Sequence, residues 1–146
     1  MSEEVEENGW ERIKAHIKLY REDPDKAHEW NPYGKLTPAL LLTTTGRRSG
    51  KPRSLPLIYK KVGDAYVIAG SKGGADDDPV WYKNLQANPD CEIQVARDVF
   101  KVRARTAQGA ERQALWTQMV EVLPQYADYQ RLTDRQIPVV VLERRD

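Results

Sequence analysis

The chain of 146 residues has the size of one domain, and its 40% hydrophobic content is enough for a modest core. Lys and Arg number 23 against 22 Asp and Glu, which gives a net charge of +1. This balance argues against a nucleic-acid partner, because general nucleic-acid-binding proteins are usually strongly basic. No apolar run approaches the roughly 20 residues that a membrane-spanning helix needs.

The acidic start and the single cysteine bear on domain organisation and location. Residues 1–9 are expected to be a disordered acidic tail, unlike the positively charged start of a secretory signal, and residues 10–146 a single domain. Cys91 excludes an internal disulfide framework and is interpreted as structural, because no activating base lies near it in the sequence. A lone cysteine is consistent with a reducing cytoplasm, where we expect the protein to be.

The first expected helix is amphipathic and covers residues 10–21. Its apolar residues at helical spacing are Trp10, Ile13, Ile17 and Tyr20. The favoured interpretation is a helix packed on the core, with His16 on its surface. The alternatives are a lid over a binding site and a peripheral contact with a membrane, which would make the protein membrane-associated. Residues 26–38 are expected to be irregular, with turns at Asn31-Pro32 and Thr37-Pro38.

A hairpin with a cationic turn follows. Residues 39–46 have the pattern of a buried strand and residues 54–59 that of its partner, with Gly50 and Pro52 marking the turn. Three arginines and one lysine lie between Arg47 and Arg53. The guanidinium fork matches phosphate and carboxylate groups, and lysine adds a point charge. The turn is therefore either a pocket for a small polyanion or an ordinary solvated turn.

Beyond this hairpin the pattern is mostly that of strands. The expected elements are a strand over 65–69 after a turn at 62–64, a helix over 80–87, strands over 91–96 and 99–106, a helix over 110–123, and a last strand over 137–142. Asp78 is expected to be the N-cap of the helix and Pro79 its first residue. About six mostly antiparallel strands and two or three flanking helices predict an α+β fold around a small barrel.

Two loops are candidates for the walls of one site. The first is the cationic turn, and the second is Ser71-Lys72-Gly73-Gly74, whose glycines allow a close approach of the backbone to a ligand. Leu55-Pro56-Leu57 would form an apolar wall between them, and Trp81 and Asn84 lie one helical turn apart. An apolar wall with donors and a cationic end suits a planar aromatic ligand with an anionic tail. For Trp81, simple core packing is an equal alternative.

Other kinds of site have little support in the sequence. The only histidines are His16 and His28, so neither a catalytic triad nor a histidine-rich metal site is expected. Residues 76–78, three consecutive aspartates, are interpreted as capping and loop residues rather than as a cation site. The spacings of a P-loop and of a dinucleotide-binding glycine motif are absent. No metal site is predicted.

Several stretches, weak alone, form a specific pattern in their order and spacing. They are residues 41–53, Pro56-Leu57, residues 69–75, 79–89, 126–130 and 137–141. Together they resemble the deazaflavin-dependent nitroreductase family of the split β-barrel oxidoreductases, from about residue 36 to the C-terminus. The resemblance implies a split β-barrel that binds coenzyme F-420, which has a flat tricyclic deazaflavin ring, a phosphate and an oligoglutamate tail. It also implies hydride transfer to a small-molecule acceptor such as a quinone or a nitroaromatic.

The resemblance further implies roles for individual residues. Arg47, Arg48, Ser49, Gly50, Lys51 and Arg53 would hold the phosphate and tail, and Leu55, Pro56, Leu57 and Ile58 would run beside the ring. Ala69, Gly70, Ser71, Lys72 and Gly73, with Trp81 and Asn84, would close the pocket. Tyr126 would approach the ring and, with Tyr129, shape the substrate side. Candidates for a catalytic role are Tyr126, Tyr129 and Ser71, and the proton donor is Tyr126, Ser71 or water.

Two features depart from the family's pattern. Leu123 stands where some relatives carry an aromatic residue, which bears on the range of acceptors. The aspartates at 76–78 would weaken anion binding if they faced the site. Two other functions stay open at this point: an FMN-binding oxidoreductase of the related split-barrel group, and a non-enzymatic cofactor-binding protein. FMN needs one phosphate site, whereas four cations suit a ligand with more negative charge.

Overall fold

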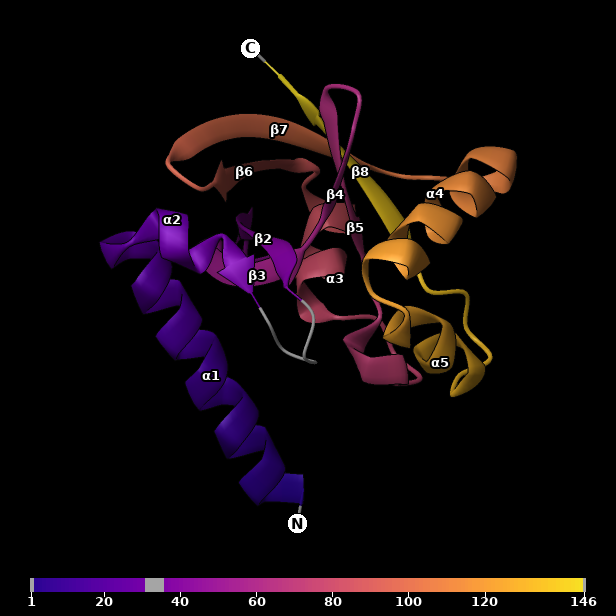
Figure 1. Cartoon of the computed structure of the whole chain (residues 1–146), viewed down its shortest axis with the longest axis horizontal. Helices are drawn as coiled ribbons and strands as arrows, with labels where there is room; N and C mark the ends of the chain where they lie inside the picture. Colours follow the sequence, from indigo (N-terminus) through magenta and orange to yellow (C-terminus); the bar gives the residue numbers. More distant parts are fainter. Residues whose placement is uncertain (1, 31–35, 146) are drawn as a thin grey trace.

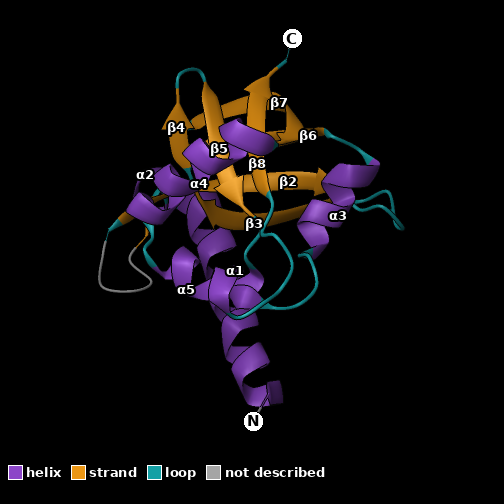
Figure 2. Cartoon of the chain, turned by 90° about the vertical axis from the view of Figure 1, so that its right-hand side faces the viewer, coloured by secondary structure: helices purple, strands orange, loops and turns teal. Residues whose placement is uncertain are grey.

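The computed structural model describes residues 2–30 and 36–145, and its described strands form one curled antiparallel sheet (Figures 1 and 2). The helices are α1 (Ser2–Glu22), α2 (Pro24–Ala27), α3 (Val80–Ala87), α4 (Gly109–Val122) and α5 (Gln125–Arg131), with a short 3-10 helix, η1, at Lys72–Gly74. The strands are β1 (Glu29–Trp30), β2 (Thr37–Thr45), β3 (Pro52–Ile58), β4 (Lys60–Val62), β5 (Ala65–Ala69), β6 (Asp90–Val95), β7 (Asp98–Thr106) and β8 (Val139–Arg144).

The sheet has the strand order β1-β2-β6-β7-β8-β5-β4, with β3 paired to β2. Every pairing is antiparallel among the described strands. In Figure 1, α1 projects from one side of the sheet, and α4 and α5 lie on the other. The α+β split-barrel fold predicted from the sequence is confirmed, with more short strands and helices than the pattern indicated.

Strands β2 and β3 form the predicted hairpin, in register from Ala39 opposite Ile58 to Thr45 opposite Pro52. The apolar start of β2 is buried, as a central strand requires. Two backbone hydrogen bonds close the turn: Gly46 N–H donates to Lys51 O, and Gly50 N–H donates to Gly46 O, both at 2.8 Å. Gly50 has φ +70, which a glycine adopts without strain.

Strands β5 and β8 are buried on both faces, because alternate residues enter two different core clusters. One cluster includes Ile68 and Leu142 together with Trp81 and Leu85 of α3. The other includes Val67, Ala69, Val139 and Val141 together with Leu115 and Met119 of α4 and Tyr126 of α5. The sheet therefore separates two packed layers, and α3 and α5 each bring a core face toward it.

Cys91 lies in β6 and is buried in the first of these clusters. Burial raises the pKa of its thiol to about 12. The thiol is therefore protonated at neutral pH, in keeping with the interpretation that this cysteine is structural.

The N-terminal third differs from the sequence-based expectation. Helix α1 begins at Ser2, so residues 2–9, expected to be a disordered tail, have helical backbone. The physical reason is that glutamate is a good helix former and is favourable near a helix N-terminus. Part of the segment 26–38 is also regular, since it contributes to α2, β1 and β2. The turn expected at Asn31-Pro32 lies outside the described residues.

Two further elements differ from the prediction. Helix α5 follows Pro124 directly, although the proline was expected only to end the preceding helix. Its seven residues are too few to show a helical period. At the start of α3, Pro79 occupies the N-cap position and Asp78 makes no cap hydrogen bond. The side chain of Asp78 is instead paired with Arg135.

The packing of η1 against α5 gives a stability prediction. A Cβ atom at Gly74, where φ is +85, would lie 2.7 Å from Tyr129 O and 3.0 Å from Leu132 Cβ. We expect Gly74→Ala to lower the free energy of unfolding by about 2–4 kcal/mol, from left-handed strain and the forced displacement of α5. Gly63→Ala is the matched control, since φ is +60 and nothing lies within 4 Å. It should cost about 1 kcal/mol. Equal losses in urea denaturation would show that the contact with α5 is loose.

Candidate active site

One large cavity of about 1330 Å³ lies between α1, the β2–β3 hairpin, the loop after β5, α3 and α5. Its lining includes most of the residues singled out from the sequence: Arg47, Arg48, Ser49, Arg53, Leu55, Pro56, Leu57, Ile58, Ala69, Ser71, Lys72, Gly73, Trp81, Asn84, Tyr126 and Tyr129. Gly50, Lys51 and Gly70 lie outside the lining. The structure thus brings together segments that are separated by more than 80 positions in the sequence.

The cationic turn supplies Arg47, Arg48 and Arg53 to the cavity, and all three are exposed. None of them forms an ion pair with a carboxylate among the described side chains. Their guanidinium groups can therefore meet an anion from solution without first breaking an internal pair.

The buried side chain of Asn84, in α3, holds the backbone at the start of this turn. Its side chain is 2% exposed, and its Oδ1 accepts a hydrogen bond of 3.1 Å from the backbone N–H of Arg47. Its Nδ2 donates to Thr44 Oγ1, also at 3.1 Å. Trp81, one turn earlier in α3, belongs to the core cluster and also lines the cavity.

Strand β3 forms a long apolar wall of the cavity, from Leu55 to Ile58. Among the described strands it pairs with β2 alone, so its second edge carries backbone groups that no strand satisfies. Pro56 removes one donor from the strand. The wall therefore offers a flat apolar surface with hydrogen-bonding groups along one edge, which suits a planar ring with polar edges.

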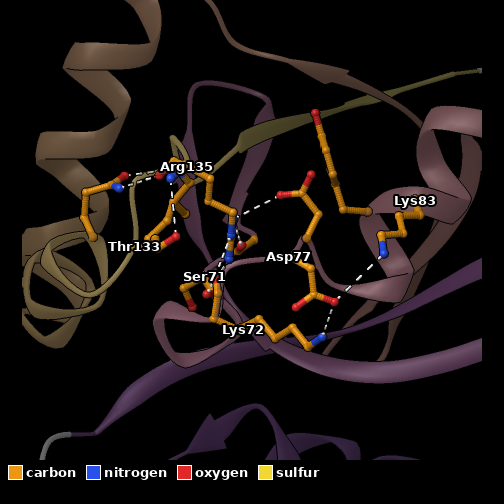
Figure 3. A network of polar contacts seen from close by, with 12 residues as sticks. Ser71, Lys72, Asp77, Lys83, Thr133 and Arg135 are labelled. Carbon is orange, nitrogen blue, oxygen red and sulfur yellow. Dashed lines mark hydrogen bonds and ion pairs between the residues drawn. The ribbon is translucent and has the colours of Figure 1, made fainter.

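The loop after β5 forms another part of the rim, with Ser71, Lys72 and Gly73 in the lining. Lys72 has φ +45, an uncommon backbone conformation for a residue other than glycine. Its Nζ lies 2.9 Å from Asp77 Oδ2, and Lys83 Nζ approaches the same oxygen at 4.0 Å (Figure 3). The hydrogen bond from Lys72 holds the pKa of the Asp77 carboxyl below its usual value.

Arg135, which was not predicted from the sequence as a site residue, links this loop to the segment before β8 (Figure 3). Its Nε donates to Ala75 O at 2.7 Å, and its Nη2 donates to Ser71 O at 2.8 Å. Its Nη1 donates both to Gly70 O at 3.1 Å and to Asp78 Oδ1 at 3.0 Å. These partners lie 57 to 65 positions away, beyond any local motif.

The three aspartates at 76–78 do not line the cavity. None of them is among the lining residues of the cavity. Asp77 is paired with lysines and Asp78 with Arg135, while Asp76 is exposed. The concern that these carboxylates repel an anionic ligand from inside the site does not apply.

The second end of the cavity is aromatic and apolar. Tyr126 is buried and Tyr129 half-buried, with ring centroids 6.4 Å apart and planes at 72°. Leu123 lines the same region and is 3% exposed. Trp30 of β1 also lines the cavity and packs on the cluster that contains Tyr126 and Leu123.

Helix α1 contributes a further wall of the cavity. A lid over a binding site was one of the alternatives for this helix, but none of its residues was predicted individually as a site residue. Arg12, Ile13, Ala15 and His16 line the cavity. His16 was expected on the helix surface, but it is 8% exposed and lies against Trp30, with Nε2 2.8 Å from Ala27 O. The expectation was wrong because α2 and β1 fold back against this face of α1. The helix packs on β3 and at the same time covers the site, and nothing in the described residues supports the membrane-contact alternative.

The described residues contain neither a metal cluster nor a membrane span. No group of three or more His, Cys, Asp or Glu side chains there could hold a metal ion. No helix in the same residues is long and apolar enough to cross a bilayer.

Comparisons with known proteins indicate the family of the chain. Residues 11–144 match the model of the family described as F-420H(2)-dependent quinone reductase. A relative of that name from Mycobacterium tuberculosis is 41% identical over 140 residues, which is 94% of this chain and 93% of the relative. A solved F-420-H2 dependent reductase, FDR-A, has a TM-score of 0.68 at 42% identity and covers 72% of this chain and 93% of its own. Another solved structure, described as a domain-swapped dimer, has a TM-score of 0.71 at 37% identity over 93% and 98%.

The chain belongs to the F-420H(2)-dependent quinone reductase family. The resemblance inferred from the sequence is confirmed, and so are the F-420-dependent reductase function and the cofactor, coenzyme F-420. The FMN and non-enzymatic alternatives give way to this assignment. The roles of individual residues stay predictions.

The Arg135 network gives a second stability prediction. The Arg135 side chain is 14% exposed and its partner Asp78 33% exposed. We expect Arg135→Leu to lower the free energy of unfolding by about 2–4 kcal/mol, because three backbone carbonyls and a carboxylate lose their donor. Arg131→Leu is the control: its side chain is 76% exposed, and its pair with Asp128 should be worth less than about 1 kcal/mol. Chemical denaturation measures both, and equal effects would contradict a structural role for Arg135.

Proposed function

We propose that the cavity between α1 and β3 is the active site, in which this chain reduces a quinone with reduced coenzyme F-420. The observation that carries the proposal is that one cavity combines arginines without an ion pair among the described side chains, an apolar strand with an open edge, and an aromatic end. Each part matches one part of the reaction: the anionic tail, the planar ring and the aromatic acceptor.

The size and donor set of the cavity fit the coenzyme. Ligand pockets usually measure roughly 300–1,000 Å³, so a cavity of about 1330 Å³ has room for a coenzyme ring and an acceptor together. Arg47, Arg48 and Arg53 would bind the phosphate and the first carboxylates of the tail, with Ser49 as a further donor. The backbone of residues 55–58 would run beside the ring.

The protein positions the coenzyme ring and the acceptor, because the coenzyme itself supplies the hydride. Asn84 would hold the cationic turn, and Arg135 would hold the loop carrying Ser71, so that the two rims keep a fixed spacing around the ring. Tyr126, Tyr129 and Leu123 would pack on the acceptor. The aliphatic side chain of Leu123 leaves this end apolar, which suits a quinone ring.

Arginine substitutions test the anion site. We expect Arg47→Ala and Arg53→Ala each to weaken coenzyme binding by about 1.5–3 kcal/mol, because each loses a charge-assisted hydrogen bond. Lys51→Ala removes the same charge from the same turn, but Lys51 lies outside the lining, so its effect should be smaller. Fluorescence titration with oxidised F-420 gives the three affinities. Equal losses that vanish at high salt would indicate a general field instead of direct contacts.

The function itself is tested with the purified wild-type protein. Oxidised F-420 and FMN are titrated in parallel by fluorescence, and reduced F-420 is then mixed with menadione as a probe quinone. We expect F-420 to bind and FMN not to compete, with loss of reduced F-420 in step with the formation of the hydroquinone. Binding without turnover of menadione or of a nitroaromatic probe would overturn the proposed activity, and preference for FMN would overturn the coenzyme site.

A further inference from the structure

Trp30 is a half-buried aromatic residue in the wall of the cavity. It ends the short strand β1 and packs on the core cluster that includes Leu123 and Tyr126. Both of these residues also line the cavity, at its aromatic end. A half-buried ring in such a wall keeps surface for contact with a second ring, which makes Trp30 a candidate for contact with the acceptor.

The strand register sets the face of the sheet on which Trp30 lies. Residues directly opposite each other in an antiparallel pair point to the same face, and so do residues two positions apart in one strand. Trp30 is opposite Thr37 in the pair β1–β2. Two positions on, Ala39 is opposite Ile58 in the pair β2–β3. Trp30, Pro56 and Ile58 therefore share one face of the sheet, and all three line the cavity.

Contacts within the protein hold both the backbone and the ring of Trp30. The hydroxyl of Thr37, a residue that is 2% exposed, donates to Trp30 O at 2.8 Å. The ring of His16, in α1, lies at a centroid distance of 4.9 Å from the indole, with the planes at 57°. His16 is itself fixed, since its Nε2 lies 2.8 Å from Ala27 O. A ring that is already held loses little freedom when a ligand binds, so its contact with the ligand contributes to affinity.

Trp116 of α4 is a second tryptophan that packs on the same cluster. Its ring centroid lies 6.2 Å from that of Tyr126, and the guanidinium of Arg112 lies 5.0 Å from its ring. Unlike Trp30, it does not line the cavity. The two tryptophans thus share a core cluster and differ in their access to the cavity, so a comparison of the two separates a role in packing from a role in binding.

We propose that Trp30 is a specificity-determining residue, whose indole stacks on the ring of the acceptor and favours acceptors with a larger aromatic area. The inference rests on the proposed function. Stacked rings gain free energy from the apolar area that they bury and from the complementary charge distributions of their faces and edges. The gain therefore grows with the part of the indole that the acceptor ring covers. Trp30 takes no part in the transfer of hydride or proton and acts only on the binding of the acceptor.

Trp30→Leu tests the stacking with two acceptors: menadione, which has two fused rings, and 2-methyl-1,4-benzoquinone, which has one. We expect KM to rise about tenfold for menadione and about threefold or less for the benzoquinone, because the larger ring loses more stacking. The value of kcat should stay near that of the wild type, since binding is affected and the chemical step is not. Affinity for oxidised F-420 should be unchanged. Trp30→Phe keeps a smaller ring and should lie between the wild type and Trp30→Leu.

Trp116→Leu is the matched control, and its KM for both acceptors should stay near that of the wild type. A wild-type KM for menadione in Trp30→Leu would overturn the inference. An equal rise in KM for the two acceptors, or the same rise in Trp116→Leu, would also overturn it, because either result would indicate general damage to the core. A matching loss of F-420 affinity would contradict a role confined to the acceptor.

A second readout uses the wild-type sequence and does not depend on turnover. With oxidised F-420 bound, menadione cannot be reduced, so its complex is stable and its saturation is followed by calorimetry. Labelling with 5-fluorotryptophan gives fluorine signals from four residues, and Trp30→Phe and Trp116→Leu assign two of them. We expect the Trp30 signal to shift with menadione and the Trp116 signal to stay.

An unmoved Trp30 signal at saturation would overturn the inference, even if the Trp30→Leu protein fails to fold. The proposed function fails separately, if the wild-type protein binds no F-420 or reduces no menadione.

Discussion

The antiparallel pairing of β2 with β3 is the constraint on which the site depends. Its register runs from Ala39 opposite Ile58 to Thr45 opposite Pro52, so the hairpin ends where the cationic turn begins. The same register leaves the second edge of β3 open along the apolar wall. A slip of one residue would turn Leu55 and Leu57 to the other face of the strand and so change the wall of the cavity. The β2–β3 hairpin thus determines the positions of both the cationic turn and the apolar wall of the site.

Two polar side chains, Asn84 and Arg135, hold the loops at the two rims of the site in place against the core. Asn84 holds the backbone of Arg47 from α3, and Arg135 holds the backbone from Gly70 to Ala75. Both act on backbone groups and leave the side chains at the rims available for a ligand. The net charge of +1 gives the protein no general attraction for anions, so the arginines of the turn act locally.

The sequence alone was sufficient for the parts of the site that are continuous in the chain. The hairpin, its turn and the helix with Trp81 and Asn84 have local patterns of apolar residues, glycine and proline, and the structure has them where expected. Arg135 and His16 were missed for a physical reason: their roles depend on contacts with distant backbone, at Ser71 and Ala27, and no spacing rule encodes these. Helix α5 was missed because it is shorter than two helical turns.

The most direct test of this account is a crystal structure of the protein with oxidised coenzyme F-420. We predict the coenzyme phosphate within hydrogen-bonding distance of Arg47 or Arg53, and the ring along residues 55–58 with its open face toward Tyr126 and Trp30. A coenzyme bound elsewhere, or a ring that does not contact β3, would contradict the central claim that the β2–β3 hairpin builds the active site.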